Sequence, residues 1–259
     1  MRRARPPFRE QSVNRLVPNM LTVMALIAGL TAIRYGLAGS WERSVVAIII
    51  AAVCDGLDGR IARLLGGSTK FGAELDSLSD VISFGVAPSV LLYLWALNAA
   101  GGLGWTVSLL FTICCALRLA RFNTKLDDTT QPAWSARFFT GVPAPVAAGL
   151  ALLPMMISFE IGGGVVDRPI VVAIVMIGVA GLMVSRIPTY SFKRIKVPHH
   201  AVMPTLLGVA LLIALLVSAT WLTMIGVGIC YLISVPFSIR AYRRLQRGDE
   251  MSPSVVPPG

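Results

Sequence analysis

Four aspartates near one turn of an otherwise apolar chain are the residues best suited to chemistry. They form two pairs, Asp55 with Asp58 and Asp76 with Asp80, separated by three and four residues. Residues at these spacings share one face of a helix, so each pair projects its carboxylates in one direction. The connection over 65–71 is short, which predicts that the two helices are antiparallel neighbours. We therefore expect all four carboxylates to converge at one level along the helix pair.

Carboxylates held this close and partly removed from water need a compensating positive charge. A divalent cation supplies that charge, and oxygen ligands without histidine or cysteine favour Mg²⁺ or Mn²⁺ over Zn²⁺. Gly59 and Ala62 leave room for a ligand on the same helix, and the planar guanidinium of Arg63 can reach a phosphate. The alternative is that the acids only pair with Arg60, Arg63 and Lys70 as solvated charges. Four acids at this spacing, with small residues between them, favour an open metal site that faces a phosphate.

The composition shows what kind of protein must position these acids. Of 259 residues, 55% are hydrophobic and only 14% are charged, whereas soluble domains carry about 25% charged residues. Eight apolar stretches are each about as long as a membrane-spanning helix, roughly 20 residues. They cover residues 18–37, 43–65, 74–98, 103–122, 139–158, 169–185, 201–217 and 219–239. The sequence therefore predicts an all-α, polytopic membrane helix bundle of about eight transmembrane helices.

The distribution of basic residues predicts the orientation of this bundle. If the eight stretches all cross the membrane, one side holds every Lys and Arg of the 23 except Arg34, Arg43 and Arg168. Lys and Arg accumulate in cytoplasmic loops, so both termini and the even-numbered connections are expected in the cytoplasm. The same bias, together with contact with anionic membrane lipids, accounts for the net charge of +10. No nucleic-acid partner is expected.

A longer pattern surrounds the four aspartates and extends the argument beyond their spacing. It reads Asp55-x2-Asp58-Gly59-x2-Ala62-Arg63-x8-Gly72-x3-Asp76-x3-Asp80. This pattern resembles the signature of the CDP-alcohol phosphotransferase family. The resemblance implies a homodimeric membrane enzyme that transfers a phosphatidyl-type group from a CDP-activated lipid to an alcohol and releases CMP.

The resemblance also implies a role for each acid. Two divalent metal ions, Mg²⁺ or Mn²⁺, would be bridged by Asp55 and Asp76. Asp58 would complete the first metal site and Asp80 the second. Asp80 would also be the catalytic base that takes the proton of the acceptor hydroxyl. This assignment agrees with the chemistry, because an alcohol is a poor nucleophile at neutral pH and needs a nearby base.

Further residues are assigned by the resemblance to binding of the donor, CDP-diacylglycerol. One group lies within or beside the signature, and a second lies at the start of the first apolar stretch, where Pro18-Asn19 alone would indicate only a helix start. The donor-binding candidates are Pro18, Asn19, Thr22, Gly59, Ala62, Arg63, Thr69 and Gly72.

Two later connections resemble the bacterial and archaeal branch of the family whose acceptor is L-serine. The fourth connection contains residues 117–124 and 138–145, and the sixth contains residues 183–193. An amino-acid acceptor needs a cation for its carboxylate, and Arg binds carboxylates through two parallel hydrogen bonds. Arg118, Arg121 and Arg186 are the candidates for this task, and Asn123 and Ser185 could add polar contacts. Arginines at helix ends are also ordinary topology signals, and these polar residues could equally be cap or turn residues.

Other functions remain open at this point. The same chemistry could use glycerol 3-phosphate, inositol phosphate or choline as the acceptor. A cation transporter is an alternative of a different class, but the acids lie at span ends rather than near the midplane, where transporter sites usually lie. A route to the same product through two H-x-K motifs is excluded, because the only histidines are the adjacent His199 and His200.

The chain is thus expected to form a multi-pass protein of the cell inner (cytoplasmic) membrane, with its active site facing the cytoplasm. The last two apolar stretches carry no pattern that we assign to a function. The expected parts are a basic cytoplasmic segment (1–17), the transmembrane core with the signature (18–200), two additional helices (201–241) and a cytoplasmic tail (242–259).

Overall fold

The computed structural model describes residues 13–65, 69–126, 138–185, 187–190 and 202–251. The chain forms two compact units, 1–91 and 92–259, and each is described by itself. The elements are α1 (Val13–Leu37), α2 (Trp41–Leu64), α3 (Lys70–Asp80), η1 (Val81–Val86), α4 (Ala87–Trp95), η2 (Leu97–Ala100), α5 (Gly101–Leu126), β1 (Phe138–Thr140), α6 (Ala144–Ala151), α7 (Leu153–Ile161), α8 (Pro169–Val184), β2 (Pro188–Tyr190), α9 (Val202–Ser218) and α10 (Thr220–Met251).

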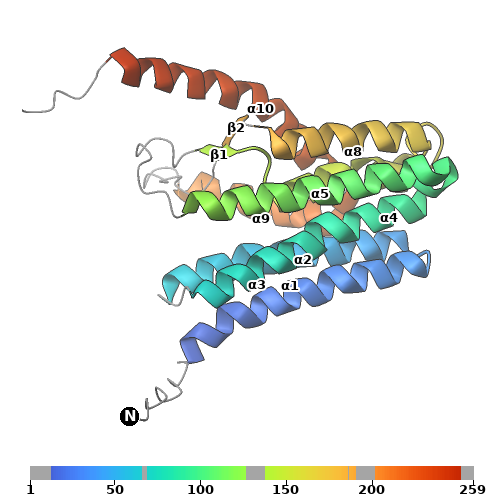
Figure 1. Cartoon of the computed structure of the whole chain (residues 1–259), viewed down its shortest axis with the longest axis horizontal. Helices are drawn as coiled ribbons and strands as arrows, with labels where there is room; N and C mark the ends of the chain where they lie inside the picture. The colour runs from blue at the N-terminus through green and yellow to red at the C-terminus, as the bar shows by residue number, and fades with distance from the viewer. Residues whose placement is uncertain (1–12, 66–68, 127–137, 186, 191–201, 252–259) are drawn as a thin grey trace, which may run out of the picture. The chain divides into compact units, whose positions relative to one another are not determined.

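The first unit is organised around one face of α1. Figure 1 shows α1, α2 and α3 running side by side, and α1 packs against α2 as well as against α3 and η1. The buried face of α1 has residues at alternating spacings of four and three, and most of them are small. Small side chains let the backbones of membrane helices approach closely. These residues are Pro18, Thr22, Ala25, Gly29, Ala32 and Gly36.

The closest approach on this face lies between α1 and η1. A Cβ atom added at Gly29 would lie 2.5 Å from Ser83 Oγ and 2.8 Å from Ser83 Cα, so only glycine fits there. Ser83 Oγ donates a hydrogen bond of 3.2 Å to the carbonyl of Ala25. The π-helical turn η1 has a local cause, because Pro88 has no N–H to donate to the carbonyl of Phe84. Helices α3 and α4 continue on either side of this turn.

The second unit contains α5, the short helices α6 and α7, and α8, α9 and α10. The buried face of α5 includes Ser108, Phe111 and Cys115, and α5 packs against α8. Helix α10 packs against α7, where the rings of Phe159 and Trp221 meet edge-on with centroids 4.8 Å apart. Strands β1 and β2 form a two-stranded antiparallel sheet. This small sheet was not predicted.

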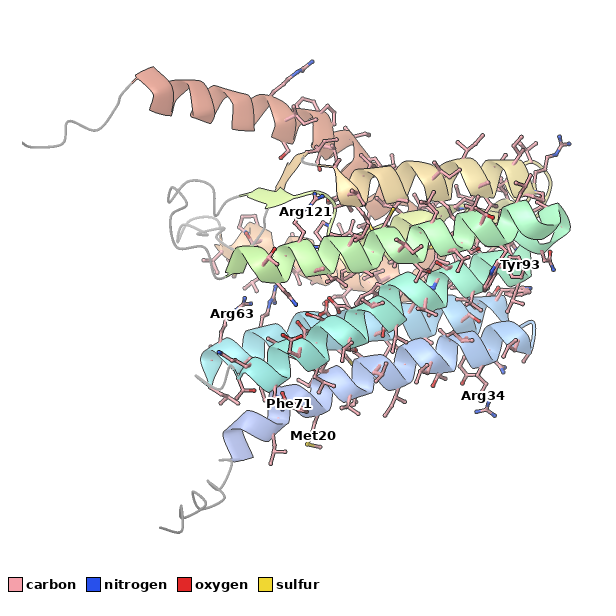
Figure 2. All side chains as sticks on the ribbon, in the orientation of Figure 1. Met20, Arg34, Arg63, Phe71, Tyr93 and Arg121 are labelled. Carbon is pink, nitrogen blue, oxygen red and sulfur yellow. The ribbon has the colours of Figure 1, made fainter. Side chains whose placement is uncertain are left out.

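The helices confirm the predicted polytopic helical bundle. In the described part of the chain, five helices are long and apolar enough to cross a membrane: 16–37, 70–95, 97–124, 144–161 and 220–240. Helices α8 and α9 are apolar but shorter. Helix α2 is 24 residues long and carries the charged residues Asp55, Asp58 and Arg63 of the signature. Eight crossings and a cytoplasmic location for both termini stay predictions. Figure 2 shows Arg34 and Arg63 at opposite ends of the first unit, as the charge pattern predicts.

The predicted start of the fifth stretch was wrong by several residues, and α10 continues to Met251, beyond the expected end of the eighth stretch at residue 239. The fifth stretch was expected to be helical from residue 139, whereas residues 138–140 form β1 and the helix begins at Ala144. Gly141 has a positive φ of 78° and Pro143 precedes the helix, so this segment turns before α6 starts. The expected boundary between the core and the additional helices, at residues 200 and 201, lies outside the described residues.

Candidate active site

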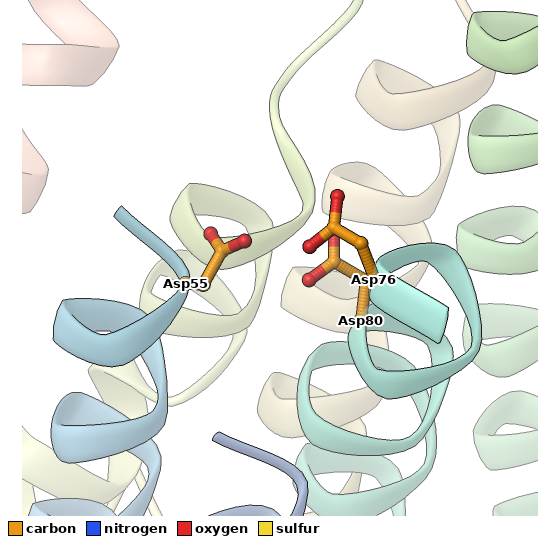
Figure 3. Close-up of side chains that lie close together, drawn as sticks. All are labelled: Asp55, Asp76 and Asp80. Atoms are coloured by element: carbon orange, nitrogen blue, oxygen red, sulfur yellow. The ribbon is translucent and has the colours of Figure 1, made fainter. Parts of the chain in front are cut away.

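Helices α2 and α3 bring three of the four predicted metal ligands together. Asp55 comes from α2, and Asp76 and Asp80 come from α3, one helical turn apart (Figure 3). One carboxylate oxygen from each residue lies within 4.8 Å of the other two. Asp80 is only 9% exposed, so it sits at the inner side of the group. The predicted convergence of these three carboxylates is confirmed.

The charges and atom types of this group fit a divalent cation. The oxygens of Asp55, Asp76 and Asp80 lie within 4.8 Å of one another, close enough for a single ion to contact all three carboxylates. Two oxygens bound to one Mg²⁺ at about 2.1 Å lie about 3 to 4 Å apart, so small side-chain rotations would bring these oxygens into one coordination sphere. Oxygen donors of this kind suit Mg²⁺ and Mn²⁺. The carboxylates could therefore hold divalent metal ions.

Asp58 has a different environment from the other three acids. It is 4% exposed, and its Oδ2 accepts a hydrogen bond of 2.6 Å from the Thr22 hydroxyl of α1. The group of three oxygens within 4.8 Å does not include Asp58. The same helix nevertheless carries Asp55 and Asp58 on neighbouring turns. Its role in the first metal site stays a prediction.

Three of the predicted donor-binding residues gather at the start of α3. Thr69 is the N-cap of this helix, and its hydroxyl oxygen accepts a hydrogen bond of 3.0 Å from the Gly72 N–H. A Cβ atom added at Gly72 would lie 2.8 Å from Asn19 Oδ1, so the Asn19 side chain lies directly against this turn. The glycine thus permits close contact between α1 and α3. Thr69 has a structural role that the sequence analysis did not identify.

The other donor-binding candidates lie along α2 and α1. An added Cβ at Gly59 would meet no atom within 4 Å among the described residues, so the backbone there is open to a ligand. Ala62 is partly exposed and Arg63 is exposed, whereas Pro18 and Thr22 are buried. The structure therefore separates candidates that a ligand can reach from candidates packed inside the helix bundle.

The candidate acceptor-binding residues belong to the second unit. Arg118, Arg121 and Asn123 are half-buried on α5. The Nη1 of Arg121, labelled in Figure 2, donates a hydrogen bond of 2.7 Å to the carbonyl of Val184 at the end of α8. Cations stabilise the carbonyl-rich C-terminal ends of helices, so this contact has a structural role.

Ser185 ends the same helix. Its hydroxyl donates a hydrogen bond of 2.8 Å to the Leu182 carbonyl and accepts one of 3.4 Å from the N–H of Ile187. The structure therefore brings Ser185 and Arg121 to the same end of α8, where Ser185 is a cap residue. Arg186 lies outside the described residues.

Comparison with known proteins identifies the family. The family model described as CDP-alcohol phosphatidyltransferase matches residues 15–184. The chain belongs to the CDP-alcohol phosphatidyltransferase family. A second model, CDP-alcohol phosphatidyltransferase 2, matches residues 200–236. This second match covers α9 and the first part of α10, in which the sequence analysis found no functional pattern.

Similar proteins span bacteria and archaea. The chain is 38% identical to a CDP-diacylglycerol–serine O-phosphatidyltransferase of Mycobacterium leprae over 247 residues, which cover 95% of this chain and 82% of that protein. It is 38% identical to a protein of the same name from Helicobacter pylori over 183 residues, 70% of this chain and 74% of that one. It is 35% identical to an archaetidylserine synthase of Methanothermobacter thermautotrophicus over 173 residues, 66% of this chain and 68% of that one.

Proposed function

We propose that this protein transfers the phosphatidyl group of CDP-diacylglycerol to the hydroxyl of L-serine, giving phosphatidylserine and CMP. The observation that carries the proposal is the convergence of the Asp55, Asp76 and Asp80 carboxylates within 4.8 Å of one another. These residues lie inside the segment that matches the family model. The names of the similar bacterial proteins support L-serine as the acceptor.

The four aspartates would hold two divalent cations, Mg²⁺ or Mn²⁺. Asp55 and Asp76 would contribute to both sites, Asp58 to the first and Asp80 to the second. When bound, such ions stabilise negative charge on the attacking and leaving oxygens of a phosphoryl transfer. Three carboxylates within 4.8 Å of one another support this assignment, since they offer several oxygen ligands to one ion.

Asp80 is proposed as the base. A serine hydroxyl has a pKa far above neutral pH, so the attack on the donor phosphorus needs a residue that accepts the hydroxyl proton. Asp80 is 9% exposed and lies at the C-terminal end of α3, directly before the π-helical turn. The packing of this turn against α1 through Ser83 fixes the backbone that follows the base.

The open surface of α2 and the start of α3 are proposed to bind the donor. Gly59 presents open backbone, and the exposed Arg63 guanidinium suits the diphosphate of the donor. Asn19 and Gly72 form a compact contact near the same helix ends, beside the cap residue Thr69. Pro18, Thr22 and Ala62 complete the set that the family resemblance assigns to the donor.

The carboxylate of L-serine is proposed to bind an arginine of the second unit. Arg118 and Arg121 remain alternatives for this role, with Arg186 a third and Asn123 and Ser185 as polar neighbours. The bond from Arg121 to the Val184 carbonyl uses Nη1 and fixes the orientation of the guanidinium. A fixed, planar guanidinium supports bidentate binding of a carboxylate.

The proposed setting is the cytoplasmic membrane, with the acids on the cytoplasmic side and the protein as a homodimer. The excess of basic residues in the connections on one side supports this orientation.

The test is CMP release by the purified protein with CDP-diacylglycerol and Mn²⁺ or Mg²⁺. L-Serine is compared with glycerol 3-phosphate, inositol phosphate and choline, and Asp80→Asn serves as the inactive control. We expect release with L-serine alone. Release with another alcohol would keep the chemistry and overturn the acceptor. Folded protein that releases no CMP with any of them would overturn the proposal and favour cation transport.

A further inference from the structure

Thr22 of α1 forms a short hydrogen bond with Asp58, one of the four aspartates Asp55, Asp58, Asp76 and Asp80 that we call the acidic centre. Its side chain is 4% exposed, and its hydroxyl donates to Asp58 Oδ2 at 2.6 Å. This length is typical of a charge-assisted bond from a hydroxyl to a carboxylate, about 2.5 to 2.7 Å. The Pro18 carbonyl lies 3.2 Å from the same hydroxyl. A hydroxyl has one proton, and the shorter contact to the charged group is the stronger one.

The backbone of the same residue contacts the other acid-bearing helix. Ser79 Oγ of α3 donates a hydrogen bond of 3.1 Å to the Thr22 carbonyl, and Ser79 is 2% exposed. Ser79 directly precedes Asp80 and follows Asp76 by three residues. Thr22 therefore bonds to Asp58 on α2 through its side chain and to α3 through its main chain. We call Thr22, Asp58 and Ser79 the α1 bridge.

We propose that Thr22 and Ser79 are positioning residues for the acidic centre and that the α1 bridge sets the geometry in which it binds divalent cations. The Thr22 hydroxyl engages Oδ2 of Asp58 and so orients this carboxylate. The Ser79 bond fixes α3 against the same residue of α1. Helix α1, which carries none of the four aspartates, thus fixes the positions of the α2 and α3 carboxylates relative to one another.

This inference rests on the proposed function in one respect, because it takes the cation site to be that of the transfer reaction. It changes the role expected for Thr22. The family resemblance assigns Thr22 to donor binding, whereas its hydroxyl is buried and committed to Asp58. Partners that orient a ligating side chain typically change metal affinity by about 10- to 100-fold when they are removed.

Thr22→Val tests the bridge, because valine keeps the branched shape and removes the hydroxyl. Thr22→Ser keeps the hydroxyl and is the conservative rescue. Thr31→Val is the matched control: Thr31 lies on the same helix, and its hydroxyl donates to the Ile27 carbonyl at 2.6 Å. Mn²⁺ affinity is measured by electron paramagnetic resonance on purified full-length protein without substrates. Thermal unfolding of each variant is recorded in parallel.

We expect Thr22→Val to weaken Mn²⁺ binding by about 10- to 100-fold, and Thr22→Ser and Thr31→Val to bind Mn²⁺ like the wild type. Activity assays are expected to show a matching rise in the Mn²⁺ concentration needed, with the KM for CDP-diacylglycerol unchanged at saturating Mn²⁺. Unchanged Mn²⁺ affinity with a raised KM for CDP-diacylglycerol would overturn the proposal and make Thr22 a donor contact.

Ser79→Ala is a second variant that keeps the test decisive if Thr22→Val does not fold. Removing this one hydroxyl is expected to lower Mn²⁺ affinity several-fold while the protein remains folded, and unchanged affinity would overturn the bridging role. The binding measurement needs no turnover. If the wild type binds Mn²⁺ but does not use L-serine, the proposed function fails while the comparison of variants still decides this inference.

Discussion

Gly29→Ala tests whether close packing of α1 against η1 supports the acidic centre. The added Cβ would lie 2.5 Å from Ser83 Oγ and 2.8 Å from Ser83 Cα. Carbon atoms in contact lie about 3.5 to 4.0 Å apart, so α1 and η1 must separate by roughly 1 Å. A backbone atom is involved, so a side-chain rotation cannot relieve the overlap. The separation also lengthens the bond from Ser83 to the Ala25 carbonyl, which is 3.2 Å in the structure.

Overpacking of this kind costs about 1 to 3 kcal/mol. At about 2 to 4 °C per kcal/mol for a chain of this size, the expected fall in Tm is roughly 2 to 12 °C. CMP release should fall as well, because Ser83 follows Asp80 by only three residues. Thermal unfolding of the purified protein in detergent measures the first effect, and the CMP assay measures the second.

Gly178→Ala in α8 is the matched control for this substitution. An added Cβ there meets no atom within 4 Å among the described residues. Alanine is the better helix former by about 1 kcal/mol, so the control should keep or slightly raise Tm. An unchanged Tm for Gly29→Ala, or equal losses in the two variants, would refute the packing argument.

Further predictions concern the proposed reaction. Asp80→Asn should abolish CMP release while CDP-diacylglycerol binding stays largely intact, and equal loss of both would show that Asp80 is chiefly a metal ligand. Chelation of divalent cations should stop CMP release, and added Mn²⁺ or Mg²⁺ should restore it, whereas activity that survives chelation would contradict the metal assignment. Gly72→Ala would direct a Cβ toward Asn19 Oδ1 at 2.8 Å, so the KM for CDP-diacylglycerol should rise more than kcat falls; an unchanged KM would count against a donor role for this turn. Arg118→Lys and Arg121→Lys keep the charge but lose the planar fork, and a raised KM for L-serine in either variant would identify the carboxylate ligand, whereas unchanged values in both would contradict the proposal.

The convergence of the acids could be predicted from the sequence because it depends on local rules. Helical spacing fixes the faces of Asp55, Asp76 and Asp80, and the short connection between their helices brings those faces together. The bond between Thr22 and Asp58 joins residues 36 apart in the chain. It depends on the register of α1 against α2, which no local spacing determines. The small residues along α1 were the available signal, since they predict a close helix contact on that face.

The end of α8 shows a second limit of sequence reasoning. Arg121 and Ser185 were singled out as candidates for the acceptor, and the structure gives both of them bonds that complete this helix end. A polar residue at a helix end has the same sequence pattern whether it caps the helix or binds a ligand. Strands β1 and β2 were missed for a related reason, because three residues are too few to show an alternating pattern.

The most direct test of the proposed function follows the acceptor into the product. Purified protein is supplied with CDP-diacylglycerol, Mn²⁺ or Mg²⁺ and isotopically labelled L-serine, and the lipids are analysed by mass spectrometry beside CMP. The account predicts labelled phosphatidylserine in equal amount to CMP, and neither product from Asp80→Asn. CMP formed without labelled lipid, or labelled lipid formed equally well by Asp80→Asn, would contradict it.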